Sequence, residues 1–341
     1  MAFKDTYPFM AFGGKIDPVS EIRNAGIVTS GNVYWVKDPS DADYISFKDA
    51  VGKENFSDTI QGAIDKCTDD QNDYVMVCPK ASNAVWALTS AVDMNKARVH
   101  LISVGYTKAT YGYTNELTGF ATDSTEDEII HVTAEGCEIA GFRLHGTCGT
   151  GSAGTIDNGL LYLSGSAHNL WVHDCAIETS GTAWTANLPA GAVAGAASQH
   201  GARFDNCTIG GLVISTDGSQ VPVTCSASGK RWEFNDCKFL MLSGHVGQKF
   251  VVAGTGAIDY TLLNRCKFIN TDATNAVTSC VSGIVTADQG QVLMDYCTGV
   301  NVLAFGTNAN TRVSPNIHSG TSVFISNPNI ALIGTAALPT V

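Results

Sequence analysis

The sequence predicts an all-β protein built as a solenoid of parallel strands, and three observations support this. A short phrase with a cysteine near its centre recurs six times. Its cysteines are 38, 32, 30, 29 and 31 residues apart, and self-similarity at intervals of roughly 20 to 50 residues indicates a repeat architecture. Apolar positions alternate on either side of each cysteine, which is strand spacing and not helix spacing. The six phrases are Val132–Ile139, Leu170–Ile177, Ala202–Ile209, Trp232–Phe239, Thr261–Phe268 and Val292–Gly299.

Each phrase divides into two strand halves with a corner between them. The third residue before the cysteine and the second after it are apolar, with Gly299 as the exception. Two residues intervene where a continuous strand would allow one, so the chain must bend for both halves to face one interior. The bend pair contains Asn206, Asn235 or Asn264, and Asn tolerates the left-handed backbone conformation that such a corner needs.

A strand, a corner with Asn and a second strand, repeated every thirty or so residues, resembles the right-handed parallel β-helix of pectate-lyase-like proteins. The resemblance covers about residues 56–300 and implies the fold, but that fold hosts lyases, hydrolases, adhesins and virion proteins alike. Equivalent positions of successive coils lie about 4.8 Å apart, so we expect the repeated cysteines to form an inward column of packed thiols. These cysteines are Cys137, Cys175, Cys207, Cys237, Cys266 and Cys297.

Composition suggests three regions, namely an arm over residues 1–50, the solenoid over 51–300 and a closing segment over 301–341. The first region lacks the cysteine phrase and is rich in aromatic residues, so it has too much apolar surface to remain in water. It either folds back as a cap or docks on a neighbouring subunit or larger assembly. The docking alternative would use Phe3, Tyr7, Phe9, Phe12, Tyr34 and Trp35.

The stretch Phe56–Cys67 predicts one amphipathic helix. Ile60, Ala63, Ile64 and Cys67 are spaced three and four apart behind a cap at Ser57 or Asp58. A helix followed by short strands resembles the entry to the β-helices of bacteriophage tail spikes and related virion proteins. Such a helix can cover the open apolar end of the first coil.

Two further segments depart from the repeat. Gly181–Gly201 is rich in small residues and contains Trp184, so we expect an excursion from a coil there and a possible glycan contact. Residues 301–341 keep short apolar runs, including Val323–Ile325 and Ile330–Ile333. That segment is expected to cap the last coil or to pack against other subunits.

The net charge of -12 argues against nucleic acid and anionic membrane as partners, because an acidic surface repels both. No apolar run is long enough for a membrane span, and the first residues lack the pattern of a secretion signal. We therefore expect folding in a cytoplasm. The eleven cysteines are an odd number and include no Cys-x-x-Cys pair, so neither a complete disulfide framework nor a usual zinc site is expected.

No set of catalytic residues stands out in the sequence, and no cofactor is expected. Acidic residues recur at the corners, where Asp and Asn satisfy backbone groups; we interpret them as structural. The cluster Asp123–Glu128 is expected to be a solvated loop. Basic residues on neighbouring coils are expected to pair with the acidic corners, and the eight histidines show no metal spacing. The corner acids are Asp174, Asp205, Asp236 and Asp295, and the basic residues are Arg203, Lys238, Arg265 and Lys267.

These observations favour a non-enzymatic structural protein of a bacteriophage virion, assembled in the host cytoplasm. Within that class we expect a capsid-surface decoration protein, with itself (as a homotrimer) and the major capsid protein as partners. One alternative is a tail spike or fibre protein that binds or depolymerises a cell-surface polysaccharide. Its mark would be acidic side chains that converge beside exposed aromatic rings. A cellular carbohydrate-active enzyme or adhesin is the third hypothesis.

Overall fold

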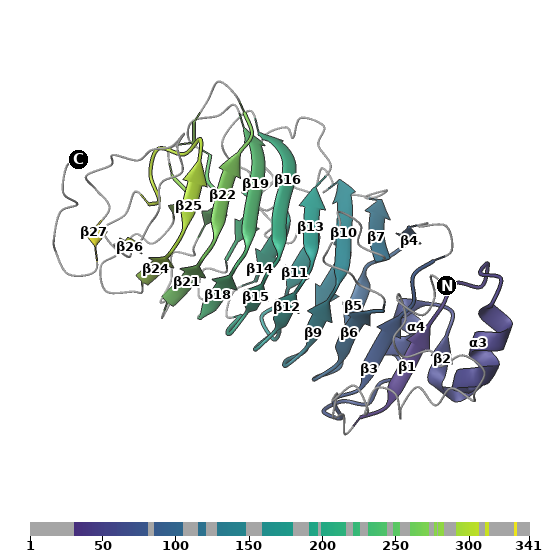
Figure 1. The fold of residues 1–341 in the computed structure, drawn as a ribbon. Coiled ribbons are helices and arrows are strands. Elements are labelled where there is room, and N and C mark those ends of the chain that lie inside the picture. The colour runs from purple at the N-terminus through teal and green to yellow at the C-terminus, as the bar shows by residue number, and fades with distance from the viewer. Residues whose placement is uncertain are drawn as a thin grey trace.

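The computed structural model describes residues 31–80, 85–104, 115–120, 128–147, 159–179, 191–196, 199–215, 221–225, 231–243, 248–252, 260–272, 276–277, 279–282, 291–306, 311–313 and 331–332. These residues form three sheets in which every pairing is parallel. The strands stack along one axis (Figure 1). The right-handed parallel β-helix predicted from the sequence is confirmed.

Each complete coil contributes one strand to each sheet, in the chain order C, A, B. Sheet A contains, in spatial order, β2 (Phe56–Ser57), β1 (Val33–Val36), β3 (Tyr74–Val77), β6 (His100–Ser103), β9 (Glu138–Ala140), β12 (Trp171–His173), β15 (Arg203–Asp205), β18 (Trp232–Asn235), β21 (Tyr260–Asn264), β24 (Gln291–Asp295), β26 (Thr311–Val313) and β27 (Ala331–Leu332). Sheet B contains β4 (Trp86–Leu88), β7 (Asn115–Phe120), β10 (Phe142–Thr147), β13 (Ala176–Thr179), β16 (Thr208–Ser215), β19 (Lys238–Ser243), β22 (Lys267–Asn270) and β25 (Thr298–Val300). Sheet C contains β5 (Val92–Met94), β8 (Ile130–Val132), β11 (Leu161–Leu163), β14 (Val193–Gly195), β17 (Val223–Thr224), β20 (Val251–Val252) and β23 (Val281–Ser282).

The helix predicted over Phe56–Cys67 is shorter than expected. Phe56–Ser57 is strand β2, and the helix α4 spans Ile60–Ile64. Its N-cap is Thr59, whose hydroxyl accepts a hydrogen bond from the Gly62 amide at 3.0 Å. The prediction of Ser57 or Asp58 as the cap was therefore wrong, because the chain pairs as a strand before it enters the helix. The buried side chains of α4 still join the main core, as a capping helix requires.

Residues 31–50 belong to the N-terminal end of the solenoid and not to a separate arm. Trp35 lies in β1, is 4% exposed and packs edge-on against Phe47 of α3 (Tyr44–Val51) at 5.5 Å. Tyr34, on the other face of β1, packs against the main core. Trp35 is therefore too buried to dock on a neighbour, whereas docking by Tyr34, whose side chain is partly exposed, stays a prediction. Phe3, Tyr7, Phe9 and Phe12 lie outside the described residues.

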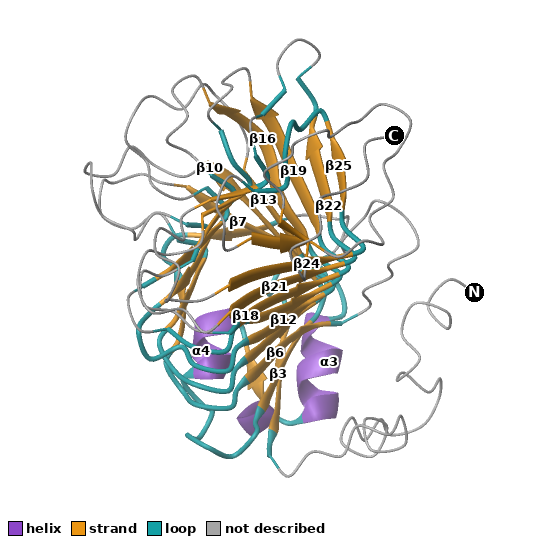
Figure 2. Cartoon of the chain, turned by 90° about the vertical axis from the view of Figure 1, so that its left-hand side faces the viewer, coloured by secondary structure: helices purple, strands orange, loops and turns teal. Residues whose placement is uncertain are grey.

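Two helices therefore finish this end of the molecule from different sides. The α3 helix covers the outer face of sheet A, where a second apolar cluster contains Trp35, Phe47, Phe56 and Met76. The α4 helix packs against β1, β3 and β5 and belongs to the main core. Figure 2 shows α3 and α4 on either side of the sheet A strands β3 and β6. A single-turn 3₁₀ helix, Lys53–Asn55, connects α3 to β2.

The coils of β9, β12, β15 and β18, in which both corners are described, turn sharply on both sides of the sheet A strand. After the strand, the residue directly before the inward side chain has a positive φ; this group is Gly141, Asp174, Asn206, Asp236, Arg265 and Tyr296. Before the strand, Arg98, Gly136, Asn169, Gly201 and Arg231 have the same conformation. The sequence correctly predicted a left-handed residue at the corner, but Asn235 and Asn264 do not adopt it. The residue directly before the cysteine adopts the left-handed conformation instead.

The corner before a sheet A strand resembles the corner after it. For this reason the prediction wrongly placed Cys137 in the cysteine column, which follows the sheet A strands. Glu138 pairs with Trp171 and Arg143 pairs with Ala176. Phe142, and not Cys137, is therefore in register with Cys175. Cys137 instead precedes its sheet A strand, at the position that Leu170 occupies in the next coil. The column of cysteines runs from Cys175 to Cys297, and Phe142 stands in the coil before it.

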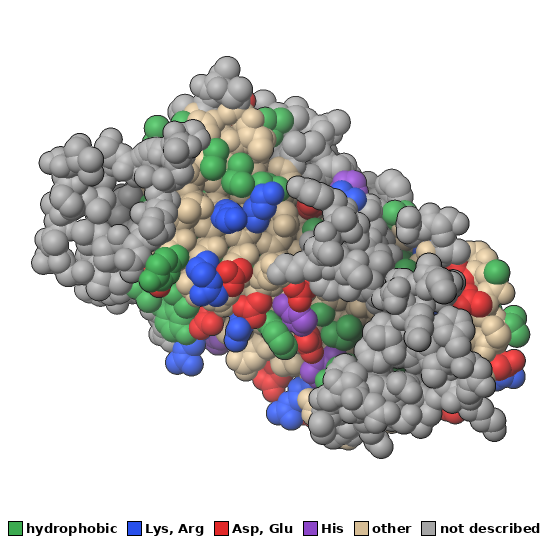
Figure 3. All heavy atoms as spheres, in the orientation of Figure 1, with side chains coloured by type: hydrophobic (Ala, Val, Ile, Leu, Met, Phe, Trp, Pro, Cys, Tyr) green, Lys and Arg blue, Asp and Glu red, His purple; other side chains and the backbone are tan. Residues whose placement is uncertain are grey.

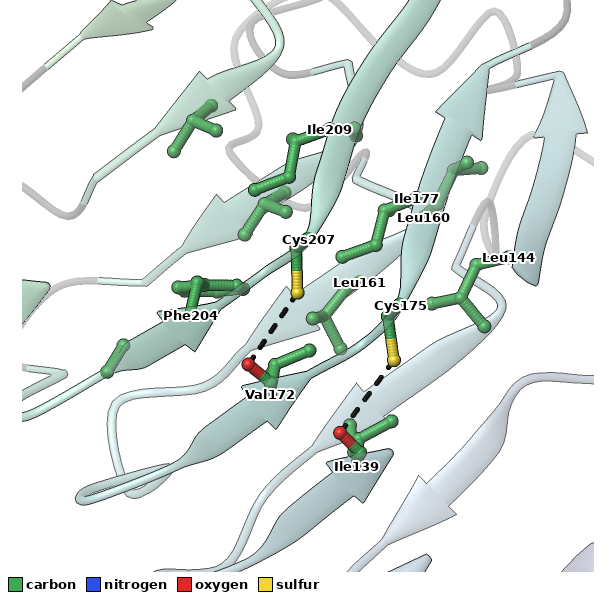
Figure 4. Packing of buried hydrophobic residues seen from close by; sticks show 14 of the residues in the cluster. Ile139, Leu144, Leu160, Leu161, Val172, Cys175, Ile177, Phe204, Cys207 and Ile209 are labelled. Atoms are coloured by element: carbon green, nitrogen blue, oxygen red, sulfur yellow. Dashed lines mark hydrogen bonds between the residues drawn. The ribbon is translucent and has the colours of Figure 1, made fainter. Parts of the chain in front are cut away.

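The five cysteines of this column are at most 1% exposed and bridge neighbouring coils. Each thiol donates to a backbone carbonyl oxygen of the preceding coil. The acceptor lies three residues before the position that matches the cysteine in that coil. Figure 4 shows Cys175 bonded to Ile139 and Cys207 to Val172, at 3.7 and 3.6 Å. Cys137 is equally buried but donates to Lys96 and Ala134. Burial raises the pKa of the Cys175 thiol to about 12, so this group is neutral at physiological pH.

The segments expected to depart from the solenoid are partly built into it. Within the predicted excursion Gly181–Gly201, residues 181–190, with Trp184 among them, and residues 197–198 lie outside the described residues, but Val193–Gly195 is strand β14 of sheet C. Beyond residue 300, β26 and β27 continue sheet A in parallel. Val302 and Phe305 also join the core. The solenoid thus extends past the predicted boundary.

Candidate functional site

The outer face of sheet A carries a cluster of ionisable side chains over three neighbouring strands. Glu138 of β9 lies between His100 of β6 and His173 of β12. His100 Nδ1 contacts one carboxylate oxygen of Glu138, and His173 Nε2 contacts the other at 2.7 Å. His173 Nδ1 lies 3.0 Å from Asp174 Oδ2. We call His100, Glu138, His173 and Asp174 the histidine–carboxylate network.

The network is mostly buried although it lies on an outer face. The side chains of Glu138, His100 and His173 are only 15%, 17% and 20% exposed. Burial would raise the pKa of Glu138, but the hydrogen bonds with His100 and His173 outweigh it and lower the pKa to about 2. For His173, burial favours the neutral form, yet the contacts with Glu138 and Asp174 raise its pKa above the ordinary value. Glu138 is therefore an anion at neutral pH.

Aromatic rings border the network on both sides. Tyr74 of β3 stacks on His100 with the ring centroids 4.2 Å apart. On the other side, the rings of Trp171 and His173 are 4.2 Å apart. Trp171 is 40% exposed, and its indole nitrogen donates to Asp205 Oδ2 at 2.7 Å. An exposed ring held in one orientation beside carboxylates can bind the apolar face of a sugar.

The polar contacts continue toward the C-terminal coils. Asp205 also accepts hydrogen bonds from Arg203 and from the Asn235 amide, at 2.7 and 2.8 Å. The Asn264 amide in turn donates to Asn235 at 3.3 Å. These corner side chains connect one coil to the next.

Three more carboxylates of this region have partners on the chain. Asp174 accepts a hydrogen bond from the Asn206 amide. Glu233 accepts one from the Tyr260 hydroxyl at 2.7 Å. Asp236 forms a two-pronged ion pair with Arg265, with both contacts at 2.7 Å. In Figure 3, acidic, basic and histidine side chains gather in the lower middle of the view, over these strands.

The predicted pairing of basic residues with acidic corners was right for two residues and wrong for two. Arg203 pairs with Asp205, and Arg265 pairs with Asp236. Lys238 and Lys267, which begin β19 and β22 of sheet B, form no ion pair within the described part of the chain, and the nearby Asp236 pairs with Arg265. Of the acidic loop Asp123–Glu128, only Glu128 is described.

Sequence reasoning missed the centre of the network. Neither the repeat nor the spacing of the histidines assigns a role to His100, Glu138, His173 or Trp171. The alignment of the coils contains a signal for this site. Glu138 directly follows Cys137, the cysteine before the sheet A strand β9. Once Cys137 is aligned with Leu170, Glu138 falls beside His100 and Trp171.

Two kinds of feature are absent from the described ranges. Among these residues no group of three or more His, Cys, Asp or Glu side chains is arranged to hold a metal ion. None of their helices is both long and apolar enough to cross a membrane.

Comparison with known proteins yields similarity of fold alone. No family model matches the chain, and no curated protein matches its sequence. A pectin methylesterase in complex with a hexasaccharide has 11% identity and a TM-score of 0.47, over 84% of this chain and 80% of that one. Pectin methylesterase PemA from Erwinia chrysanthemi has 10% identity and a TM-score of 0.47, with coverages of 86% and 81%.

Two other solved structures are also similar to this chain. A rhamnogalacturonan lyase has 12% identity and a TM-score of 0.44, over 86% of this chain and 84% of that one. The ORF18 protein of Geobacillus virus E2 has 14% identity and a TM-score of 0.27, with coverages of 73% and 55%. At these values the similarity concerns the coiled architecture and carries no argument about activity.

Proposed function

We propose that this chain is a non-enzymatic structural protein of a bacteriophage particle, and specifically a decoration protein of the capsid surface. One observation carries the proposal. Five carboxylates on or beside the outer face of sheet A serve as connections between coils. Glu138, Asp174, Asp205, Glu233 and Asp236 each bind a side chain of a neighbouring coil.

Such engagement suits a rigid scaffold better than a polysaccharide-cleaving enzyme. Cleavage of a glycosidic bond uses one carboxyl group that donates a proton and another that acts as base or nucleophile. Glu138 has a pKa of about 2 and contacts two histidines. It is therefore a poor proton donor. Asp205 has three partners at distances between 2.7 and 2.8 Å.

The state of the cysteines supports assembly in the host cytoplasm. Ten described cysteines are free thiols, and all ten are buried. Abundant reduced cysteines fit folding in a reducing compartment. Virion localisation, self-association as a homotrimer and contact with the major capsid protein are parts of the same proposal.

The decisive experiment is binding to separated phage parts. Purified protein is expected to bind empty heads and not tails. A variant that lacks residues 1–30 is expected to lose binding while keeping its fold, if Phe3, Tyr7, Phe9 and Phe12 dock on the head. Deletion of residues 1–50 is unsuitable, because it removes β1 and α3. A full-length protein that ignores heads, or that degrades a polysaccharide as a free monomer, contradicts the proposal.

A second candidate function is glycan binding by a tail spike or fibre. The observation that favours it is Trp171, which is 40% exposed among acidic and basic side chains. The expected outcome of that hypothesis is binding to host surface polysaccharide that Trp171→Ala weakens at least about tenfold. Ile45→Ala is the control, because Ile45 is 66% exposed on α3 and distant in sequence from the candidate surface. Equal binding by wild type and Trp171→Ala excludes this surface.

A further inference from the structure

The outer face of sheet B changes character along the solenoid. In the coils of β10 and β13 it presents His145 and Glu178, which are in register with each other. The next strand, β16, has Gly210 at this position, with φ at 113° and a register shift immediately after it. A Cβ at Gly210 would lie 2.0 Å from the Leu240 carbonyl oxygen, so glycine is required at this bulge. Beyond it the same row becomes apolar.

Aliphatic side chains occupy the outer face in the last three coils. Leu240 of β19, Ile269 of β22 and Val300 of β25 are in register on adjacent strands. Leu242 is a second outward residue of β19, where the burial pattern alternates strictly. Leu240, Leu242 and Ile269 are partly exposed, and Val300 is 40% exposed. Contiguous apolar rows on an outer face mark interaction sites more often than isolated apolar residues do.

Two lysines border this apolar row. Lys238 and Lys267 are directly opposite each other on β19 and β22, an arrangement in which like charges repel. Within the described residues neither has an ion-pair partner. Figure 3 shows two neighbouring basic side chains with apolar ones above them, on the upper part of the molecule where β19 and β22 lie. A basic pair on a chain of net charge -12 favours an acidic partner.

We propose that this face, formed by Lys238, Leu240, Leu242, Lys267, Ile269 and Val300, is the contact surface for a second copy of this chain. The inference rests on the self-association that is part of the proposed function. An apolar centre with charged residues at its edge is the usual composition of a protein–protein interface. A second copy also supplies acidic side chains that can pair with Lys238 and Lys267. Residues 31–73 alone contain ten acidic and four basic residues, and Asp69 and Asp70 are exposed.

The test is the oligomeric state of the full chain, measured by sedimentation velocity at about 1 to 100 µM. The wild type is expected to be an oligomer in this range. Leu240→Asp is expected to weaken association at least about tenfold, since it places a charge in the apolar centre. The double charge reversal Lys238→Glu with Lys267→Glu should weaken it as well, and its effect should fall as salt is added.

Matched controls separate the surface from general effects. Val85→Asp introduces the same charge at a 37% exposed aliphatic residue directly before β4, at the other end of sheet B, and Lys249→Glu reverses a partly exposed lysine shortly before β20 of sheet C. Both are expected to associate like the wild type. Circular dichroism and melting temperature show whether each variant is folded. If either Leu240→Asp or the double charge reversal does not fold, the other variant tests the proposal.

Two outcomes overturn the proposal, namely a wild type that is monomeric at 100 µM and folded surface variants that associate like the wild type. The first also overturns the proposed self-association, but neither decides the decoration role. A monomer that binds phage heads would retain the decoration role and lose this surface. An oligomer that depends on Leu240 but ignores heads would retain the surface and lose that role.

Discussion

The two faces of sheet A are made by the same strands but are stabilised differently. On the inner face, Phe204 and Phe234 are fully buried, and at the adjoining corner the buried thiol of Cys237 donates to the Phe204 carbonyl oxygen. On the outer face, Glu138 and the residues around it form ion pairs and side-chain hydrogen bonds. The contribution of the inner face to stability therefore comes from close packing. The contribution of the outer face depends on the protonation state of its ionisable side chains. Changes on the two faces should differ in size and in their response to pH.

The largest effect is expected from an inner-face aromatic residue. Phe234→Ala should lower the free energy of unfolding by about 3 to 5 kcal/mol, the cost of a large cavity in a packed core. Phe234 is fully buried, and its ring stacks on Phe204 at 5.0 Å. Denaturant titration measures the loss. Trp171→Ala, which removes a 40% exposed ring from the outer face of the same sheet, should cost clearly less; an equal cost would contradict the comparison.

A smaller effect is expected from the thiol column. Cys237→Ser should cost about 1 to 3 kcal/mol, because a polar hydroxyl replaces a thiol in a dry interior. The carbonyl of Phe204, now 3.4 Å from the sulfur, is available to the hydroxyl and favours the lower end of that range. Thermal melting of Cys237→Ser and Cys237→Ala separates the polarity of the hydroxyl from the loss of volume. A wild-type melting temperature in both variants would place residue 237 outside the core.

The outer network should make stability depend on pH. The folded-state pKa of Glu138, about 2, is below its ordinary value of 4.5, so its contribution is present above pH 4.5 and is lost as pH falls toward 2. The folded-state pKa of His173 is above its ordinary value of 6.5. Its contribution is therefore complete below pH 6.5 and is lost as pH rises through the raised pKa.

Melting temperature measured against pH tests these signs. His173→Gln should remove the loss of stability on the alkaline side, and Glu138→Gln should flatten both sides of the profile. Glu135→Gln changes an exposed carboxylate in the same coil and should leave the shape of the profile as it is. Identical profiles for wild type and Glu138→Gln would show that the network does not stabilise the fold.

The smallest effect is expected at the exposed corner. Asp236→Asn breaks the pair with Arg265, whose side chain is 54% exposed. Ion pairs in water contribute little, so the melting temperature should stay close to that of the wild type. The small difference should shrink further as salt is added. A large, salt-independent loss would place this pair among the buried contacts.

The sequence allowed the coil, its period and most inward positions to be predicted, since alternation and cysteine spacing are local signals. It did not distinguish the two corners of a coil, because Gly136 and Asp174 both adopt a left-handed conformation before an inward cysteine. The interval of 38 residues before Cys175 was the visible irregularity. Measured from Phe142, that interval becomes 33 residues and fits the others.

The candidate site was harder to predict because its residues do not repeat. Glu138, His100 and Trp171 occupy one outward row, yet each is a different residue type from the next. Outward positions are free to vary without loss of the fold, so periodicity carries no signal there. Trp35 was misjudged for a related reason. Aromatic residues before the first repeat cannot be aligned with the positions of the repeat. Only the pairing of β1 with β3 assigns them to the solenoid.

The corner bonds have a consequence for how the molecule unfolds. The left-handed corner amides of Asp174, Asn206 and Asp236 each donate to a carbonyl of the following coil, at 2.8 to 3.0 Å. The column thiols donate to the preceding coil. An interior coil is thus completed only by both neighbours, and a coil that loosens leaves unpaired groups on each side. Strong coupling between nearest neighbours makes a repeat array melt over long blocks and not unit by unit. Amide exchange in the interior coils should then report one shared opening event.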